Sequence, residues 1–288
     1  MRTYASCRTP EEFNAGYANA ITPGVVAKWE THFRDRSLHV LASPVRRVEL
    51  TYGPHQRQRI DLFPSPSAGP DAPTLIAIHG GLWFLFDRWM MHFLVPAFTA
   101  AGVHVACPGY RLAPKHTLGE IVADCRGAVA CLQAEASAHG LNPGRFSVLG
   151  HSAAGQLAAV LAATDWTGLK PNRYAPPLHS WTGVSGFYEI EPFALTGFQP
   201  LVGFTPEEYR QWNPMNLVRS GMPPGLLITG ARESAWLHEM SREYASALHA
   251  TTNAARSIDA ADECHFSVLN RIGDRDSDLH QAVLAQLF

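Results

Sequence analysis

The sequence predicts an α/β fold in which a mostly parallel sheet is flanked by helices. Short apolar runs that are typical of buried strands alternate with longer helical segments along most of the 288 residues. One apolar run, at residues 146–149, leads directly into a Gly-His-Ser turn and an alanine-rich helix, which gives a strand–turn–helix unit. Because 46% of the residues are hydrophobic, the chain can bury one large core. We therefore expect a single domain over residues 1–288.

The N-terminal part is predicted to contain two short helices and a hairpin. Thr9-Pro10-Glu11-Glu12 is a plausible helix start, and helical sequence continues to about residue 33, interrupted by Pro23-Gly24. Two strand candidates, at 46–52 and 57–63, flank the turn residues Gly53-Pro54. Residues 64–73 are rich in Pro, Ser and Gly and indicate a loop.

The remaining elements follow the same alternation. Strands are expected at 74–78, 103–107, 146–149, 178–184, 225–229 and 255–260. Helices are expected at 88–101, 118–139, from 153 to about 165, 239–249, and from about 277 to the end. The alternation lapses at 186–224, where aromatic residues are frequent. We interpret this segment as a small lid or insertion over the sheet edge, although ordinary packing helices explain it nearly as well.

Several polar residues lie in the loops that follow predicted strands. These are the stretch His79-Gly80-Gly81 and the single residues Ser152, Glu233 and His265. In open parallel sheets ligands bind beyond the carboxyl ends of the strands. Four stretches that are distant in sequence are therefore expected to meet at one edge of the sheet.

Ser152 is the candidate nucleophile and His265 is its candidate base. The turn after 146–149 would hold the serine hydroxyl above the sheet, as in a nucleophile elbow. A serine hydroxyl attacks well only when a base removes its proton. His265 lies after the last strand and before the final helix, which is where the order Ser, acid, His places the base. A structural serine before a helix is the alternative.

Glu233 is the candidate acid. It lies in the loop after the strand at 225–229, and the next strand, at 255–260, leads to His265. Its carboxylate would orient the imidazole and stabilise the imidazolium. Alternatively, it is an acidic residue at a helix start or a partner of Arg232. Asp262 and Glu263 are poorer candidates, since they are neighbours of the base in sequence.

Backbone amides are the expected donors to an oxyanion. We expect the N–H groups of Gly81, Leu82 and Ala153 to form this oxyanion hole, because the glycines allow a close backbone approach. One residue departs from the usual elbow pattern. Ala154 stands where glycine is common, and we expect this small residue to be tolerated.

Aromatic residues near these motifs are candidates for a substrate pocket. A single aromatic residue is more often part of the core than of a site, but as a group near the sheet edge they are candidates for pocket contact. The set consists of Trp83, Phe84, Phe86, Phe187, Tyr188 and Trp236.

Composition and charge exclude several classes of function. The net charge of −2 gives no electrostatic case for nucleic acid or for an anionic membrane. No signal peptide and no apolar run of membrane-spanning length are visible. The five cysteines, at positions 7, 107, 125, 131 and 264, show no CxxC spacing and indicate reduced thiols in a cytoplasmic protein without a metal site.

The motifs together resemble the α/β-hydrolase superfamily, on its esterase and lipase side. The resemblance is carried by His79-Gly80-Gly81-Leu82-Trp83, Tyr110-Arg111-Leu112-Ala113-Pro114, Gly150-His151-Ser152-Ala153, Glu233 and His265. The chain is most similar to the kynurenine formamidase (arylformamidase) group, through its HGGxW loop, Ala163-Thr164-Asp165-Trp166, Cys264-His265-Phe266 and Arg59-Ile60-Asp61-Leu62-Phe63.

The resemblance implies a hydrolase without metal or cofactor. It implies Ser152 as nucleophile, Glu233 as acid and His265 as base, with N-formylkynurenine or a related small aryl formamide or ester as substrate. Several relatives carry Asp where this chain has Glu233. Three alternatives remain open: a general carboxylesterase, an acyl hydrolase or transferase of a biosynthetic pathway, and a scaffold that binds a ligand without chemistry. Apolar residues in 186–224 are compatible with a homodimer.

Overall fold

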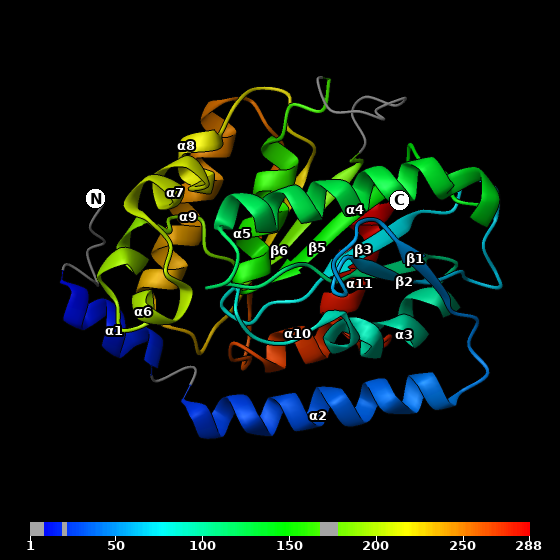
Figure 1. The fold of residues 1–288 in the computed structure, drawn as a ribbon, viewed down its shortest axis with the longest axis horizontal. Coiled ribbons are helices and arrows are strands. Elements are labelled where there is room, and N and C mark those ends of the chain that lie inside the picture. The colour runs from blue at the N-terminus through cyan, green and yellow to red at the C-terminus, as the bar shows by residue number, and fades with distance from the viewer. Residues whose placement is uncertain (1–8, 19–21, 168–177) are drawn as a thin grey trace.

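A twisted, eight-stranded sheet forms the centre of the part of the chain described by this computed structural model, residues 9–18, 22–167 and 178–288 (Figure 1). The strand order is β1-β2-β4-β3-β5-β6-β7-β8. The first two pairs, β1 with β2 and β2 with β4, are antiparallel, and the neighbouring strands from β4 to β8 are parallel. The predicted mostly parallel α/β sheet is confirmed. The strands are β1 Val48–Thr51, β2 Arg59–Phe63, β3 Thr74–Ile78, β4 His104–Pro108, β5 Phe146–His151, β6 Ser180–Val184, β7 Gly225–Gly230 and β8 Ala255–Ala260.

Helices cover both faces of the sheet, as the buried and nearly continuous apolar strands require. Figure 1 shows α4 and α5 on one face and α3, α10 and α11 on the other, with α2 running along the outside of the second layer. The helices outside the segment between β6 and β7 are α1 Pro10–Ala18, α2 Pro23–Ala42, η1 Arg88–Leu94 (a 3₁₀ helix), α3 Val95–Ala100, α4 Leu118–His139, α5 Ala153–Ala163, α9 Ala235–Ala250, α10 Ser267–Ile272 and α11 Asp278–Leu287.

Local sequence explains where the long helices begin and end. Thr117 and Glu120 form a reciprocal capping box at the start of α4, and Gly140 ends it with a left-handed φ of 68°. Pro23 stands at the first turn of α2, and the Thr22 hydroxyl accepts a hydrogen bond from the N–H of Val25. Pro23 therefore separates the two N-terminal helices, as the sequence predicted, and it is also the first residue of α2.

Four details differ from the predicted elements. Helix α2 continues to Ala42 rather than ending near residue 33, and α9 begins at Ala235, four residues before the predicted start. The predicted helix 88–101 is a 3₁₀ helix followed by α3; the change falls next to Pro96, which has no N–H to donate to an α-helical bond. The short α10 was not predicted.

The segment between β6 and β7 holds short helices in place of the regular alternation. They are η2 Glu191–Leu195 (a 3₁₀ helix), α6 Gln199–Val202, α7 Pro206–Gln211 and α8 Pro214–Leu217. Several aromatic residues of this segment are buried in the core formed with α4, α5 and α9. Its function as a lid stays a prediction, and so does the single-domain boundary at 1–288.

Candidate active site

The strand–turn–helix unit positions Ser152 on a strained turn between β5 and α5. Its backbone has φ 58° and ψ −124°, in the positive-φ region that non-glycine residues rarely adopt. The Ser152 N–H donates to the carbonyl of Val184 on β6 (2.8 Å), which ties the turn to the neighbouring strand. A side chain at Gly150 would place its Cβ 1.9 Å from the carbonyl oxygen of Ala154, so this position requires glycine.

The alanine that departs from the usual elbow pattern fits without opening the turn. Ala154 is fully buried within α5. The helix meets the backbone after β6 at the next residue, because a Cβ on Gly155 would lie 2.4 Å from the Cα of Gly186. The small residue that close packing demands is therefore Gly155.

The structure brings Ser152, His265 and Glu233 together from three different loops. His265 Nε2 lies 2.9 Å from Ser152 Oγ, and His265 Nδ1 lies 2.7 Å from Glu233 Oε2. All three side chains are at most 5% exposed. A serine hydroxyl, an imidazole and a carboxylate in this order can pass the hydroxyl proton to the imidazole while the carboxylate holds the ring in place.

The Glu233 carboxylate is fully paired inside the protein. Besides His265, it accepts hydrogen bonds from the Ser185 hydroxyl and from the N–H of Gly230 (2.9 Å), both at Oε1. Burial alone would raise the pKa of Glu233, but the charge and hydrogen bond of His265 and the donors Ser185 and Gly230 outweigh it and hold the pKa below its usual value. The group is thus kept ionised beside the imidazole.

Ser185 is a site residue that the sequence analysis missed. It follows β6 directly and has a positive φ of 49°, which directs its hydroxyl to Glu233. The pattern shared by the predicted residues, a polar side chain in the loop after a buried strand, is also present at Ser185 and could have identified it.

His151 forms a hydrogen bond with the loop that carries His265. Its Nε2 donates to the backbone carbonyl of His265 (2.6 Å), so it holds the loop that carries the base. Complete burial, with a smaller contribution from His265, lowers the pKa of His151 to about 3. His151 is therefore neutral near pH 7 and can donate this bond.

The loop after β3 presents its backbone to the same place. A Cβ on Gly80 would lie 3.2 Å from Ser152 Cβ, so this loop presses against the elbow. Gly81 has φ 104° and Leu82 has φ 50°. Within the described residues, the N–H groups of Gly81, Leu82 and Ala153 donate to no other group. The amides of these three residues stay the predicted donors to an oxyanion beside Ser152.

A pocket of about 440 Å³, which includes space open to solvent, lies against Ser152 and His265. Most of its walls are apolar side chains from the loop after β3, η1, α2 and α10, and none of the described residues that line it is Asp, Glu, Lys or Arg. The lining residues are Val26, Gly80, Gly81, Leu82, Leu85, Phe86, Met90, Met91, His151, Ser152, His265, Phe266 and Leu269.

The predicted aromatic pocket differs from the pocket in the structure. Of the six aromatic candidates, only Phe86 is among the lining residues. Trp83, Phe187, Tyr188 and Trp236 are buried core residues, and Phe84 is half-buried against the same core. The physical reason is that these rings contact each other and α1: Phe13 lies 4.4 Å from Trp236 and 5.3 Å from Phe193 between ring centroids.

One of these aromatic residues still contacts the site. The Phe187 ring stacks on the imidazole of His265, with centroids 6.5 Å apart and planes at 16°. Trp83 donates its indole N–H to Gln156 on α5 (3.1 Å), and so fixes the loop after β3 to the elbow helix. We retain a substrate-binding function for the five residues Trp83, Phe84, Phe187, Tyr188 and Trp236 only as a prediction.

No set of three or more His, Cys, Asp or Glu side chains in the described residues is placed to hold a metal ion. None of the described helices is long and apolar enough to cross a bilayer. Of the five cysteines, Cys107, Cys125, Cys131 and Cys264 are free thiols; Cys7 lies outside the described residues.

Comparisons with known proteins find a matching family model, similar sequences and solved structures of the same fold. The family model described as BD-FAE matches residues 60–175. A kynurenine formamidase of Danio rerio is 26% identical over 246 residues, covering 83% of this chain and 81% of the relative. Two solved structures share the fold: a putative thioesterase from Silicibacter sp. TM1040 (TM-score 0.80, 22% identity, 95% of this chain and 99% of the other) and an esterase of Pyrobaculum calidifontis (TM-score 0.71, 21% identity, 91% and 92%).

The fold and these relatives define the class: the protein is a hydrolase with the α/β-hydrolase fold, and it is similar to the esterases and lipases that share this fold. It is also similar to the kynurenine formamidases.

Proposed function

We propose that this hydrolase uses Ser152 as a nucleophile to hydrolyse a small aryl formamide or ester. The observation that carries the proposal is the hydrogen-bonded chain from Ser152 through His265 to Glu233, which lies at the base of an apolar pocket. The similarity to kynurenine formamidases supports a formamide or an ester as the bond that is cleaved.

In the first half of the proposed reaction, Ser152 Oγ bonds to the substrate carbonyl carbon while His265 Nε2 takes the hydroxyl proton. The carbonyl π electrons move onto oxygen, and the amides of Gly81, Leu82 and Ala153 bind the resulting oxyanion. When the carbonyl reforms, the bond to the amine or alcohol breaks. The leaving group takes the proton from His265, and the acyl or formyl group stays on Ser152.

In the second half, water replaces the leaving group. His265 removes a proton from water, the hydroxide oxygen bonds to the acyl carbon, and collapse of the second oxyanion returns the proton to Ser152 and frees the carboxylic acid or formate. Glu233 stays ionised throughout and stabilises the imidazolium that forms twice in the cycle. Its three hydrogen-bonded partners support this function.

The composition of the pocket favours an uncharged group next to Ser152. Removing an ammonium or a carboxylate from water without a partner costs several kcal/mol or more, and the lining residues include no charged partner for either. The amino-acid head of N-formylkynurenine would therefore have to stay outside this pocket. An ester or an aryl formamide without that head fits the walls better, which keeps a general carboxylesterase as the second candidate.

The experiment that tests the proposal measures kcat/KM on N-formylkynurenine, on formanilide, which lacks the charged head, and on p-nitrophenyl acetate. Ser152→Ala is the control. Turnover that is lost in Ser152→Ala supports the proposed nucleophile, and turnover that persists in the variant overturns it. A clear preference for N-formylkynurenine over formanilide would contradict the pocket argument and would establish a formamidase that recognises the head outside it.

A fluorophosphonate probe separates an enzyme from a scaffold that only binds a ligand. We expect the wild type to form a covalent adduct and Ser152→Ala to form none, because the probe reacts with an activated serine. Absence of labelling in the folded wild type would favour the binding-only alternative.

We further propose a cytoplasmic location, which the four free thiols among the described cysteines support. A homodimer through residues 186–224 stays a prediction, which size-exclusion chromatography with light scattering tests.

A further inference from the structure

The loop that carries two of the proposed oxyanion donors is strained. In this loop, residues 79–86, hereafter the oxyanion loop, positive φ angles occur at Gly81 (104°), Leu82 (50°), Trp83 (61°) and Phe86 (68°). A non-glycine residue in such a conformation is strained, and it persists only when its surroundings hold it there. The contacts that hold this loop therefore decide where its N–H groups point.

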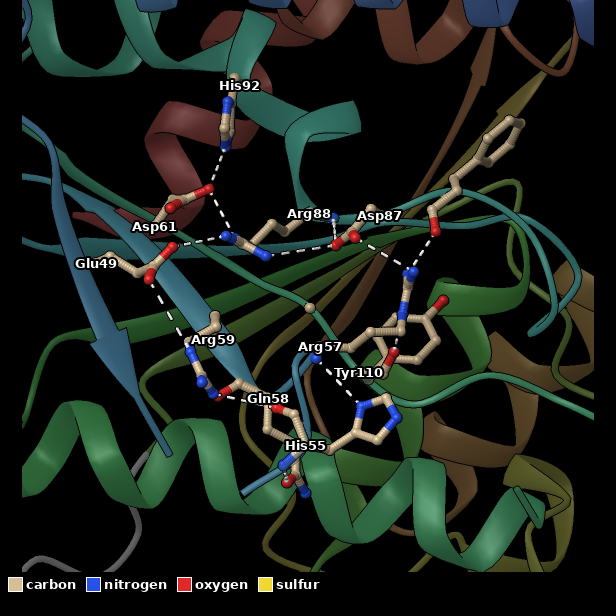
Figure 2. A network of polar contacts seen from close by, with 12 residues as sticks. Glu49, His55, Arg57, Gln58, Arg59, Asp61, Asp87, Arg88, His92 and Tyr110 are labelled. Carbon is tan, nitrogen blue, oxygen red and sulfur yellow. Dashed lines mark hydrogen bonds and ion pairs between the residues drawn. The ribbon is translucent and has the colours of Figure 1, made fainter. Parts of the chain in front are cut away.

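Arg57 contacts the end of the oxyanion loop directly (Figure 2). Its Nη2 donates to the carbonyl of Phe86 (2.5 Å), and its Nη1 lies 3.2 Å from the Asp87 carboxylate. Its Nε donates to the carbonyl of Tyr110 (2.8 Å), in the loop that follows β4. Three nitrogens of one planar guanidinium thus bind three acceptors, and the side chain is only 19% exposed.

The same arginine reaches the beginning of the oxyanion loop through Tyr110. The Tyr110 hydroxyl donates to the carbonyl of His79 (2.8 Å), and the two rings stack with centroids 4.2 Å apart and planes at 7°. Tyr110 is fully buried. Arg57 therefore holds both ends of the oxyanion loop. It binds the end at Phe86 directly, and it reaches the beginning at His79 through Tyr110.

A network of charges fixes Asp87, the third acceptor of Arg57, to the sheet. Asp87 accepts from the N–H of Arg88 (2.6 Å), and the Arg88 side chain binds Asp61 on β2 (2.9 Å) and Glu49 on β1 (2.8 Å). His92 of η1 also contacts Asp61 (2.9 Å), as Figure 2 shows. The Asp61 side chain is 2% exposed, so the network is anchored in the core.

We propose that Arg57 is a positioning residue for hydrolysis: it holds the oxyanion loop so that the N–H groups of Gly81 and Leu82 meet the oxyanion. The inference rests on the proposed function of those amides. Arg57 does not line the pocket and acts only through the loop. Lysine cannot replace it, since a single ammonium cannot match the three fixed directions of the guanidinium.

The test compares Arg57→Lys with Arg59→Lys. Arg59 is a matched control, because its Nη1 also donates to backbone carbonyls (Gly53, His55 and Gln58, 3.0–3.1 Å), but these belong to the β1–β2 turn and not to the oxyanion loop. Enzyme concentration is set by titration with the fluorophosphonate. We expect Arg57→Lys to lower kcat on p-nitrophenyl acetate by about 10- to 100-fold with a smaller change in KM, in line with small displacements of catalytic groups. Arg59→Lys should stay within about 3-fold of wild type.

A trifluoromethyl ketone gives a readout that a purely structural arginine would not change. It forms a tetrahedral adduct with serine, so its affinity depends on the oxyanion donors. We expect its inhibition constant to rise in Arg57→Lys by about the factor that kcat/KM falls. Added guanidinium at millimolar concentration should restore part of the activity of Arg57→Ala and none in Arg59→Ala.

The outcomes separate the inference from the proposed function. Suppose that wild-type turnover depends on Ser152 but folded Arg57→Lys keeps the wild-type kcat and inhibitor affinity. This result would overturn the positioning function of Arg57 and leave the proposed function intact. A variant that unfolds at lower urea concentration but keeps the wild-type kcat per titrated site would likewise make Arg57 structural only. Wild-type turnover that survives Ser152→Ala would overturn the proposed function itself.

Discussion

Lowering the pH from 8 to 5 is expected to reduce the free energy of unfolding by about 4 kcal/mol, because two buried histidines cannot take up protons in the folded state. Burial lowers the pKa of His151 to about 3 and that of His79 to about 4. His79 donates through Nδ1 to the Gly80 carbonyl, and both side chains are at most 4% exposed. Neither becomes charged in the folded protein above pH 5.

The magnitude follows from the difference between the folded and unfolded states. Each histidine has a pKa of about 6.5 when unfolded, so the unfolded chain binds more protons as the pH falls below that value. Stability is then complete above about pH 7.5 and decreases toward pH 5, by about 2 kcal/mol for each group. Burial also lowers the pKa values of His104 and His179, which adds to the loss with the same sign.

Carboxylates do not offset this loss between pH 8 and pH 5. The lowered pKa values of Glu233 and Asp61 contribute stability that is present above the unfolded carboxylate pKa of about 4 and is lost only below it. The histidines therefore dominate between pH 5 and pH 7. A total stability of about 5–15 kcal/mol is typical, so a loss of about 4 kcal/mol is easily measured.

Urea unfolding at pH 8, 7, 6 and 5, followed by tryptophan fluorescence, measures the effect. We expect His151→Gln to reduce the loss between pH 8 and pH 5 to about 2 kcal/mol. The exposed His39 on α2 provides the matched control, since His39→Gln should keep the full loss. A wild-type stability that changes by less than about 1 kcal/mol over this range, or that rises as the pH falls, would refute the reasoning.

Three further predictions concern the site and the elbow. Glu233→Gln should lower kcat by about 10²- to 10⁴-fold, less than Ser152→Ala, when both are assayed on p-nitrophenyl acetate; an equal activity to wild type would mean that the acid is another residue. Ser185→Ala should move the acid limb of the kcat/KM pH profile to higher pH, because its hydroxyl favours the ionised form of Glu233; an unmoved limb would contradict that function. Gly150→Ala should prevent folding. A Cβ at Gly140 would meet no atom within 4 Å, so Gly140→Ala suffers only from its positive φ and should lower the free energy of unfolding in urea by only about 1–2 kcal/mol. Similar losses for the two variants would contradict the steric argument.

The local order of the chain was predictable from the sequence because it depends on neighbours. Apolar runs, helix caps and glycine turns act over a few residues, and so β3, α4 and β8 begin and end where the pattern indicated. The positions of Ser152, Glu233 and His265 after strands name them as candidates, since the carboxyl ends of parallel strands share an edge. Their separations of 2.9 and 2.7 Å are consistent with that argument.

The pocket depended on packing between distant segments, which no local pattern encodes. Trp83, Phe187 and Trp236, which are near the motifs in sequence, became core because they contact one another and because α1 places Phe13 against Trp236. The walls come instead from Val26 of α2, from Met90 and Met91 of η1, and from α10, whose existence the sequence did not indicate.

The order of the elements and the candidate residues for the chemistry follow from the sequence alone. The surfaces that face Ser152, and the contacts that hold them, depend on how distant segments pack. Arg57 illustrates the difference, because its three acceptors lie in loops that are 29 and 53 residues away. Such contacts form only when the chain closes over long distances, and their partners are selected by shape and hydrogen bonding in the folded state rather than by spacing along the chain.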